Sequence, residues 1–206
     1  MFALVESGSI TKMLNSNRGI TIGDNQYPAS IFTLWTESER NAIGVYSVEI
    51  DSSNKKDEAW YNNTGITYAY DSSAKKVKGT YGTATAKPHA DTTYTNTDKS
   101  NGDIPTGKNV GDVKEEGLKT VLIRQVKRKA QEILNETDWY ITRNAEKSTA
   151  IPSAITTHRD AVRTKQAEME TAITNAADTP ALETLYTYTV TDGVQSRPLV
   201  ELPTLE

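Results

Sequence analysis

Residues 118–133 read LKTVLIRQVKRKAQEI, and their pattern decides how the second half of the chain folds. Aliphatic residues recur in this stretch every three to four positions, which is the spacing of one face of an α-helix. That face carries Leu118, Val121, Leu122, Val126, Ala130 and Ile133. The opposite face carries Arg124, Lys127, Arg128, Gln131 and Glu132. The stretch therefore predicts an amphipathic helix that packs through its apolar side.

A second helix is predicted directly after Ile151-Pro152, because proline suits the first turn of a helix and disfavours helical geometry in the residue before it. Its apolar stripe is narrow and repeats every seven residues: Ile155, Val162, Met169 and Ala176. So thin a stripe contacts a single partner helix. We expect an antiparallel αα-hairpin with the first helix, and a coiled coil between subunits is the alternative.

The first part of the chain, residues 1–83, is predicted to be a β-rich docking domain. Short runs rich in Tyr, Thr, Ile and Val are bounded there by Gly, Asn and Ser. Two hairpins are expected, one across Ser7-Gly8-Ser9 and one joining Ile66–Tyr70 to Lys76–Tyr81. Thr36-Glu37-Ser38-Glu39 has the form of a capping box, and Gly44 can end the short helix that it begins.

Residues 84–112 are predicted to be a polar linker or an exposed insert. Their only aliphatic side chains larger than alanine are Ile104 and Val110, which bury too little apolar area to repay the cost of ordering. The third part, residues 113–206, holds the helical hairpin. A short helix opened by Thr179-Pro180, a hairpin at Asp192-Gly193 and an extended strap over 198–203 follow it. The fold class expected is therefore α+β.

Composition excludes several kinds of site. The 206 residues include no cysteine and two histidines, which removes thiol chemistry, disulfides and the usual zinc sites. The net charge of −4 gives no basic field for nucleic acid. No apolar run reaches the roughly 20 residues that span a bilayer, and Met1–Glu6 lacks the features of a signal peptide. We expect no cofactor, no metal, no nucleic acid and no membrane as partners.

Two motifs resemble functional sites, but the residues around them favour a simpler explanation. Gly102–Lys108 has the spacing of a phosphate-binding loop, but Asn109 stands where a Ser or Thr would hold magnesium, and no apolar strand precedes it. Arg124 and Lys127-Arg128-Lys129 form a small basic patch without interleaved aromatic residues, which favours a solvated helix face or an acidic partner. The paired carboxylates fall in first turns of helices or in a loop, so the chain is not expected to be an enzyme.

Trp139-Tyr140 follows the first helix directly. We predict that these rings lie in the core of the helical domain, because large aromatic side chains are mostly buried on average. The alternative is an exposed hot spot, since tryptophan and tyrosine dominate the energetics of protein interfaces.

The segment Ile133–Tyr140, followed by Arg143, Ile151-Pro152 and His158–Arg163, resembles the small helical domain of the phage tail assembly chaperone family. Members of that family carry a helix ending in Leu-x-x-Thr/Ser-Asp-Trp, then a proline-initiated helix with Tyr-Arg and a second arginine four residues on. Here Trp139, Pro152, Arg159 and Arg163 match, and His158 stands in place of the usual aromatic residue. The resemblance covers residues 118 to about 180. Trp139, Arg143, Arg159 and Arg163 are the candidate partner-binding residues.

The amino-terminal part carries a second, weaker resemblance. Phe2–Val5 and the stretch from Trp35-Thr36 through Ile43–Val48 resemble the β-rich opening of tail-fibre-associated proteins of marine phages. Together the two resemblances imply a structural, non-enzymatic component of a bacteriophage tail, at the baseplate, distal tail or fibre attachment. They imply fibre, baseplate or tail-tube subunits as partners and three- or six-fold related copies, in a virion tail made in the host cytoplasm. The alternative is an assembly chaperone that leaves before the virion matures.

Overall fold

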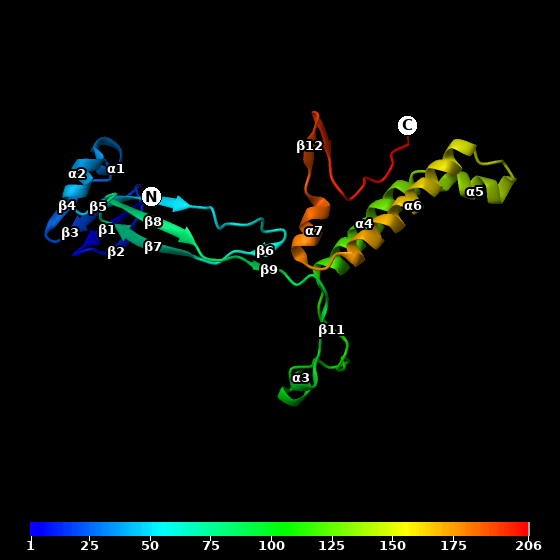
Figure 1. Cartoon of the computed structure of the whole chain (residues 1–206), viewed down its shortest axis with the longest axis horizontal. Helices are drawn as coiled ribbons and strands as arrows, with labels where there is room; N and C mark the ends of the chain where they lie inside the picture. Colours follow the sequence, from blue (N-terminus) through cyan, green and yellow to red (C-terminus); the bar gives the residue numbers. More distant parts are fainter. Residues whose placement is uncertain (206) are drawn as a thin grey trace. The chain divides into compact units, whose positions relative to one another are not determined.

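A computed structural model describes residues 1–205 and confirms the α+β class expected from the sequence. The described residues divide into two compact units, with the boundary between Thr85 and Ala86. We call them unit 1 and unit 2. Unit 1 is built mainly from strands, and unit 2 is built mainly from helices (Figure 1).

A sheet of five strands forms the centre of unit 1, as far as the chain is described, in the order β2-β1-β5-β8-β7. Its strands are β1 (Phe2–Glu6), β2 (Ser9–Leu14), β5 (Val45–Asp51), β7 (Ile66–Asp71) and β8 (Lys76–Tyr81). The neighbours pair antiparallel except β5 and β8, which are parallel. Both hairpins predicted from the sequence, β1–β2 and β7–β8, are confirmed. The parallel pair requires a crossover, and residues 52–75 supply it.

Both faces of the sheet are covered, because alternate residues of β1 point to opposite sides. On one face Leu4 packs with Val45, Leu14 and two residues of α1 (Ile31–Leu34). The hairpin of β3 (Ile20–Ile22) and β4 (Asn25–Tyr27) adds partly buried side chains to this cluster. On the other face Ala3, Val5 and Val77 pack beneath tyrosines of β5 and β7. The two faces of the sheet therefore carry separate hydrophobic clusters.

The predicted capping box begins α2 (Glu37–Ala42). Thr36 accepts a hydrogen bond from the Glu39 N–H, and the Glu39 carboxylate accepts one from the Thr36 N–H at 2.7 Å. This bond to the backbone lowers the pKa of Glu39. The helix stops at Gly44, whose φ of +79° suits glycine, and whose carbonyl accepts a hydrogen bond from Val5. The cap thus fixes α2 against the sheet.

Four short elements complete the first 101 residues. They are β6 (Tyr61–Asn62), β9 (Thr85–Ala86), β10 (Thr92–Thr93) and α3 (Asn96–Asn101).

Two long helices form the frame of unit 2: α4 (Leu118–Asn135) and α6 (Ser153–Asn175). They lie side by side and antiparallel, so that Lys119 near the start of α4 donates to the Thr174 carbonyl near the end of α6 at 2.8 Å (Figure 1). The predicted stripe of α6 is confirmed, since Ile155, Val162 and Met169 are all buried. The predicted αα-hairpin is therefore present, with α5 (Asp138–Lys147) inserted between its helices.

The predicted segments after α6 are also present. They are α7 (Thr179–Tyr186), β12 (Thr189–Thr191), β13 (Val194–Ser196) and the strap over residues 198–203, which has no regular secondary structure and bends at residues 198 and 199. Asp178 caps α7 by accepting from the Ala181 N–H at 2.8 Å. In the strap Leu199 is 1% exposed, and Leu202 packs against Ala130, Leu134 and Val162. The strap therefore supplies part of the core of unit 2.

The polar segment 84–112 lies mostly within unit 2, where it caps α4. The first N–H groups of a helix have no partner inside the helix. Here the carbonyls of Pro88 and His89 accept from Leu118 and Lys119, and the Asp91 carboxylate accepts from Gly117 at 2.7 Å. This contact with the Gly117 N–H lowers the pKa of Asp91. Beyond the cap, β10 pairs with β11 (Val113–Glu115), and α3 lies at the far end of this ribbon (Figure 1).

The α3 ribbon is held by a small polar network around Asp98. Its carboxylate accepts hydrogen bonds from the Thr95 N–H and hydroxyl at 2.7 and 2.6 Å, and it pairs with the Lys114 ammonium at 2.5 Å. Asp98 is nearly buried, and these bonds, Lys114 first, hold its pKa far below the ordinary value. The charged carboxylate thus joins α3 to β11.

We expect this network to make the ribbon sensitive to acid. A carboxylate with a depressed folded-state pKa stabilises the fold above its unfolded pKa of about 4 and loses that contribution as pH falls below it. Amide hydrogen exchange in residues 92–115 should accelerate below that pH relative to α4. Asp98→Asn should produce the same acceleration at neutral pH. Equal protection of the wild-type and variant ribbons at pH 7 would contradict this assignment.

Candidate partner-binding site

The segment Leu134–Trp139 lies at the break between α4 and α5, where the chain turns around Thr137. Thr137 is buried, and both its N–H and its hydroxyl donate to the Leu134 carbonyl at 3.1 Å. The Thr137 carbonyl then accepts from Tyr140 in the first turn of α5. Each polar group of Thr137 therefore satisfies the end of one helix or the start of the next.

Arg159 holds this break from the side of α6. Its Nη1 donates to the Leu134 carbonyl and to the Thr137 hydroxyl, both at 2.7 Å, and its Nη2 pairs with the Asp138 carboxylate at 2.8 Å. A guanidinium suits this position, because its planar set of donors reaches several acceptors at once. Arg159 thus links α6 to the end of α4 and the start of α5.

Three side chains of α5 form a stack that we call the α5 aromatic cluster: Trp139, Tyr140 and Arg143. The ring centroids of Trp139 and Tyr140 lie 3.8 Å apart. The Arg143 guanidinium carbon lies 4.7 Å from the centre of the Trp139 ring and 5.4 Å from that of Tyr140. Cation–π attraction of this kind holds an arginine against rings without neutralising its charge.

Part of this cluster is open to solvent and lacks partners. Trp139 is 51% exposed, and the neighbouring Ile141 is also exposed. Within residues 1–205 no carboxylate forms an ion pair with Arg143, and its buried Nε has no hydrogen-bond partner. The cluster therefore offers an apolar ring beside a cation whose guanidinium can still donate to a carboxylate or carbonyl oxygen.

The structure corrects two of the sequence-based interpretations. The prediction that Trp139 belongs to the core is wrong, because half of its surface is exposed. Arg159 is buried and bonds to Leu134, Thr137 and Asp138 through its two terminal nitrogens, so it positions the site rather than contacting a partner. The prediction that Arg159 binds a partner is therefore wrong.

Arg163 lies one turn further along α6 and is exposed. It forms a 3.3 Å ion pair with Asp160 and lines a shallow hollow of about 530 Å³. The hollow is lined by Leu134, Arg163, Gln166, Ala167, Glu170 and Thr171. Of the four candidate residues, the structure brings Trp139 and Arg143 into contact, with Arg159 supporting the turn before them.

The other charged features of unit 2 are mostly neutralised within the chain. In the basic patch of α4, Arg124 pairs with Glu116, Lys127 with Glu170 at 3.4 Å, and Arg128 with Glu132 at 3.8 Å. The motif with the spacing of a phosphate-binding loop, Gly102–Lys108, begins where α3 ends, because Gly102 closes that helix in a left-handed conformation. The motif therefore follows a helix rather than a strand. Over residues 1–205 no cluster of three metal-binding side chains is found.

No helix in the described chain is both long and apolar enough to cross a bilayer. Comparison with known protein families, curated proteins and solved structures finds no match to this chain.

Proposed function

We propose that the chain is a non-enzymatic structural component of a bacteriophage tail, at the baseplate, distal tail or fibre attachment, and that it acts by binding other tail proteins. The α5 aromatic cluster carries this proposal. It combines a half-exposed tryptophan with an arginine that has no carboxylate partner among residues 1–205. Tryptophan, tyrosine and arginine are the residues most enriched at the centres of protein interfaces.

The assignment to a phage tail is supported by the resemblance of residues 118–180 to the tail assembly chaperone family. Of the matching residues, Arg159 contacts Thr137 and Asp138 at the turn that precedes Trp139. Three- or six-fold related copies are the expected arrangement, because tails are built on such axes. A transient assembly chaperone is the second candidate, and the same family resemblance favours it.

The two candidates differ in where the protein is found after assembly. Quantitative mass spectrometry of gradient-purified particles should find this chain in a small fixed multiple of a known tail protein. A trace amount in particles, with abundant protein bound to a client in the lysate, would instead support the chaperone.

Trp139→Ala tests the cluster itself. Because the ring is half exposed, we expect the free energy of unfolding to fall by about 1 kcal/mol or less. Loss of a hot-spot side chain costs about 2 kcal/mol or more of binding, so the copies retained per particle should drop sharply. Urea unfolding and particle mass spectrometry measure the two effects.

Leu34→Ala is the matched control, since Leu34 is an exposed apolar side chain far along the sequence from the cluster. It should change neither quantity. Normal incorporation of the Trp139→Ala protein would remove the cluster from the proposed interface.

A further inference from the structure

The Asp192-Gly193 turn joins two strands that no other part of residues 1–205 covers. β12 and β13 pair with Thr191 opposite Val194, so Asp192 and Gly193 are the whole turn. Every residue from 187 to 196 is exposed, including both valines, at 71% and 66%. The hairpin extends away from α7 (Figure 1). A two-stranded hairpin without a packed face is only marginally stable in water, so this turn opens at little cost.

The turn also leaves its reactive groups free. Asp192 has a φ of +53° and Gly193 a φ of +77°. Glycine adopts such angles freely, whereas they are unfavourable for aspartate, so opening the turn relieves a small strain. Within residues 1–205 the Asp192 carboxylate forms no hydrogen bond or ion pair, and the Gly193 N–H donates to no acceptor. The Asp192 carboxyl carbon and the nitrogen that follows it are therefore both available for reaction.

An aspartate-glycine bond in this state rearranges with water as the only other reactant. The Gly193 nitrogen attacks Asp192 Cγ, a C–N bond forms, and the hydroxyl group of the carboxylic acid leaves as water with the proton of the N–H. A second water then opens the five-membered imide. Attack at Cγ restores aspartate, and attack at the main-chain carbonyl leaves Gly193 joined through Cβ and Cγ, which is isoaspartate. Glycine favours ring closure because no side chain hinders its nitrogen.

A second bond of this kind, Asn101-Gly102, is held by the fold. In unfolded chains asparagine-glycine bonds form the imide, with loss of ammonia, faster than aspartate-glycine bonds do. Here Asn101 is the last residue of α3, and the Gly102 N–H donates to the Lys99 carbonyl at 3.2 Å. A nitrogen in such a bond must leave it before it can attack, which requires the helix end to open. Folding therefore protects Asn101 and leaves Asp192 open.

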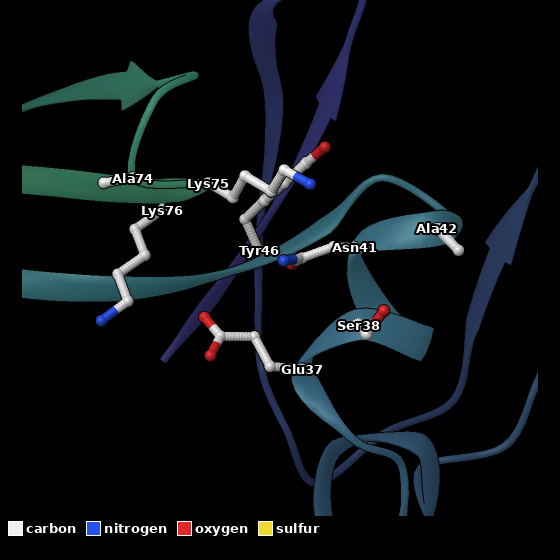
Figure 2. Close-up of a pocket in the computed structure, with 8 residues that line it drawn as sticks. All are labelled: Glu37, Ser38, Asn41, Ala42, Tyr46, Ala74, Lys75 and Lys76. Atoms are coloured by element: carbon white, nitrogen blue, oxygen red, sulfur yellow. The ribbon is translucent and has the colours of Figure 1, made fainter.

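The turn between β7 and β8 holds its aspartate by hydrogen bonds. Figure 2 shows this turn beside α2, where Ala74 and Lys75 line a hollow of about 540 Å³ together with Asn41. Asp71 begins the turn, and its Oδ1 accepts from the N–H groups of Ser73 and Ala74 at 3.1 and 2.9 Å. The bond from the Ala74 N–H lowers the pKa of Asp71. An ionised carboxylate held in this way resists attack by a nitrogen, so Asp71 is a slow site.

The base of the hairpin confines the opening to its tip. The Arg197 guanidinium pairs with the Glu201 carboxylate at 2.7 Å, and its carbon lies 5.0 Å from the centre of the Tyr188 ring. The Leu199 N–H donates to the Leu185 carbonyl at 2.9 Å. These contacts hold α7 and the strap in place when the turn opens, so unit 2 stays folded during the reaction.

From these observations together we infer that Asp192 is a modification site, at which the folded protein forms isoaspartate spontaneously. Isoaspartate places one additional atom, Cβ, in the main chain. A two-residue turn depends on the backbone angles of both its residues, so the longer link cannot hold β12 against β13. The reaction needs no partner protein and is independent of the function proposed above.

The test compares the folded full chain with the same chain unfolded in guanidinium chloride, both kept in mildly acidic buffer. Enzymatic methylation counts isoaspartate, and electron-transfer fragmentation of the peptides locates it. We expect Asp192 to react in the folded chain within about threefold of its rate in the unfolded chain. Folding should slow the reactions of Asn101 and Asp71 by about tenfold or more, because both are held by hydrogen bonds.

A disulfide across the hairpin provides the matched control, since the chain has no cysteine of its own. Val190 and Gln195 lie directly opposite each other, and the Cα atoms of such a pair are close enough for a disulfide. In the oxidised Val190→Cys/Gln195→Cys protein isoaspartate at Asp192 should form about tenfold more slowly, and a reductant should restore the rate. Two results would overturn the inference: folding slows Asp192 as much as Asn101, or the disulfide leaves the rate at Asp192 unchanged.

Discussion

Replacing Arg159 by alanine is expected to lower the free energy of unfolding of unit 2 by about 3 kcal/mol. The change leaves the Leu134 carbonyl, the Thr137 hydroxyl and the Asp138 carboxylate without their shared donor. Leu134 and Thr137 are buried, and an unpaired polar group is costly in a buried position. Urea unfolding followed by helical circular dichroism measures the effect.

Arg163→Ala is the matched control for this change. Arg163 lies four residues further along the same helix and makes one exposed ion pair, which contributes less than about 1 kcal/mol. Arg159→Lys should fall between the two, because a single ammonium cannot reach all three acceptors in the geometry of a guanidinium. If Arg159→Ala and Arg163→Ala unfold at the same urea concentration, Arg159 is not the link between α6 and the α4–α5 turn.

Gly117→Ala should destabilise unit 2 by a similar amount, about 3 kcal/mol, which is the upper end for overpacking. Gly117 precedes α4, and an added methyl group would overlap the backbone carbonyl of Ala90. Backbone cannot rotate away as a flexible side chain can. The loop over 88–91 would therefore move, and α4 would lose the acceptors that cap its first N–H groups.

Gly65→Ala provides the comparison. No atom lies within 4 Å of the position that its methyl group would take, and its φ is not positive. Alanine there should be neutral or stabilise unit 1 by about 0.5 kcal/mol, through the reduced freedom of the unfolded chain. Thermal unfolding of the two variants measures the contrast. A Gly117→Ala protein as stable as wild type would mean that the 88–91 loop tolerates displacement from α4.

Local signals explain which parts of the fold were predictable. The stripe on α4, the proline before α6, the box at Thr36 and the turn at Asp192-Gly193 each act within a few residues, and each produced the expected element. The capping of α4 by residues 88–91 was not predictable in the same way. It depends on a contact between a polar loop and a helix start almost 30 residues away, for which composition gives no signal.

The candidate site likewise combines features that local sequence predicts with features that depend on distant contacts. Arg159 was named from a motif, but its burial could have been read from spacing, since it lies on the face of α6 between Ile155 and Val162. The exposure of Trp139 depends on the direction that α5 takes after Thr137, and the tertiary contacts of Arg159 with Thr137 and Asp138 help to set that direction. The hollow at Asn41 joins α2 to a turn more than 30 residues later, so no local pattern marks it.

The strap over 198–203 has a consequence for synthesis. Translation produces unit 1 first. The buried residues of its two hydrophobic clusters all lie at or before Val77. In contrast, α4 and α6 emerge from the ribosome before Leu202, which packs against Ala130, Leu134 and Val162. Nascent unit 2 therefore exposes Ala130, Leu134 and Val162 more fully until residue 202 has left the ribosome. During that interval the apolar side of the growing helical hairpin is open to aggregation, or to protection by another protein.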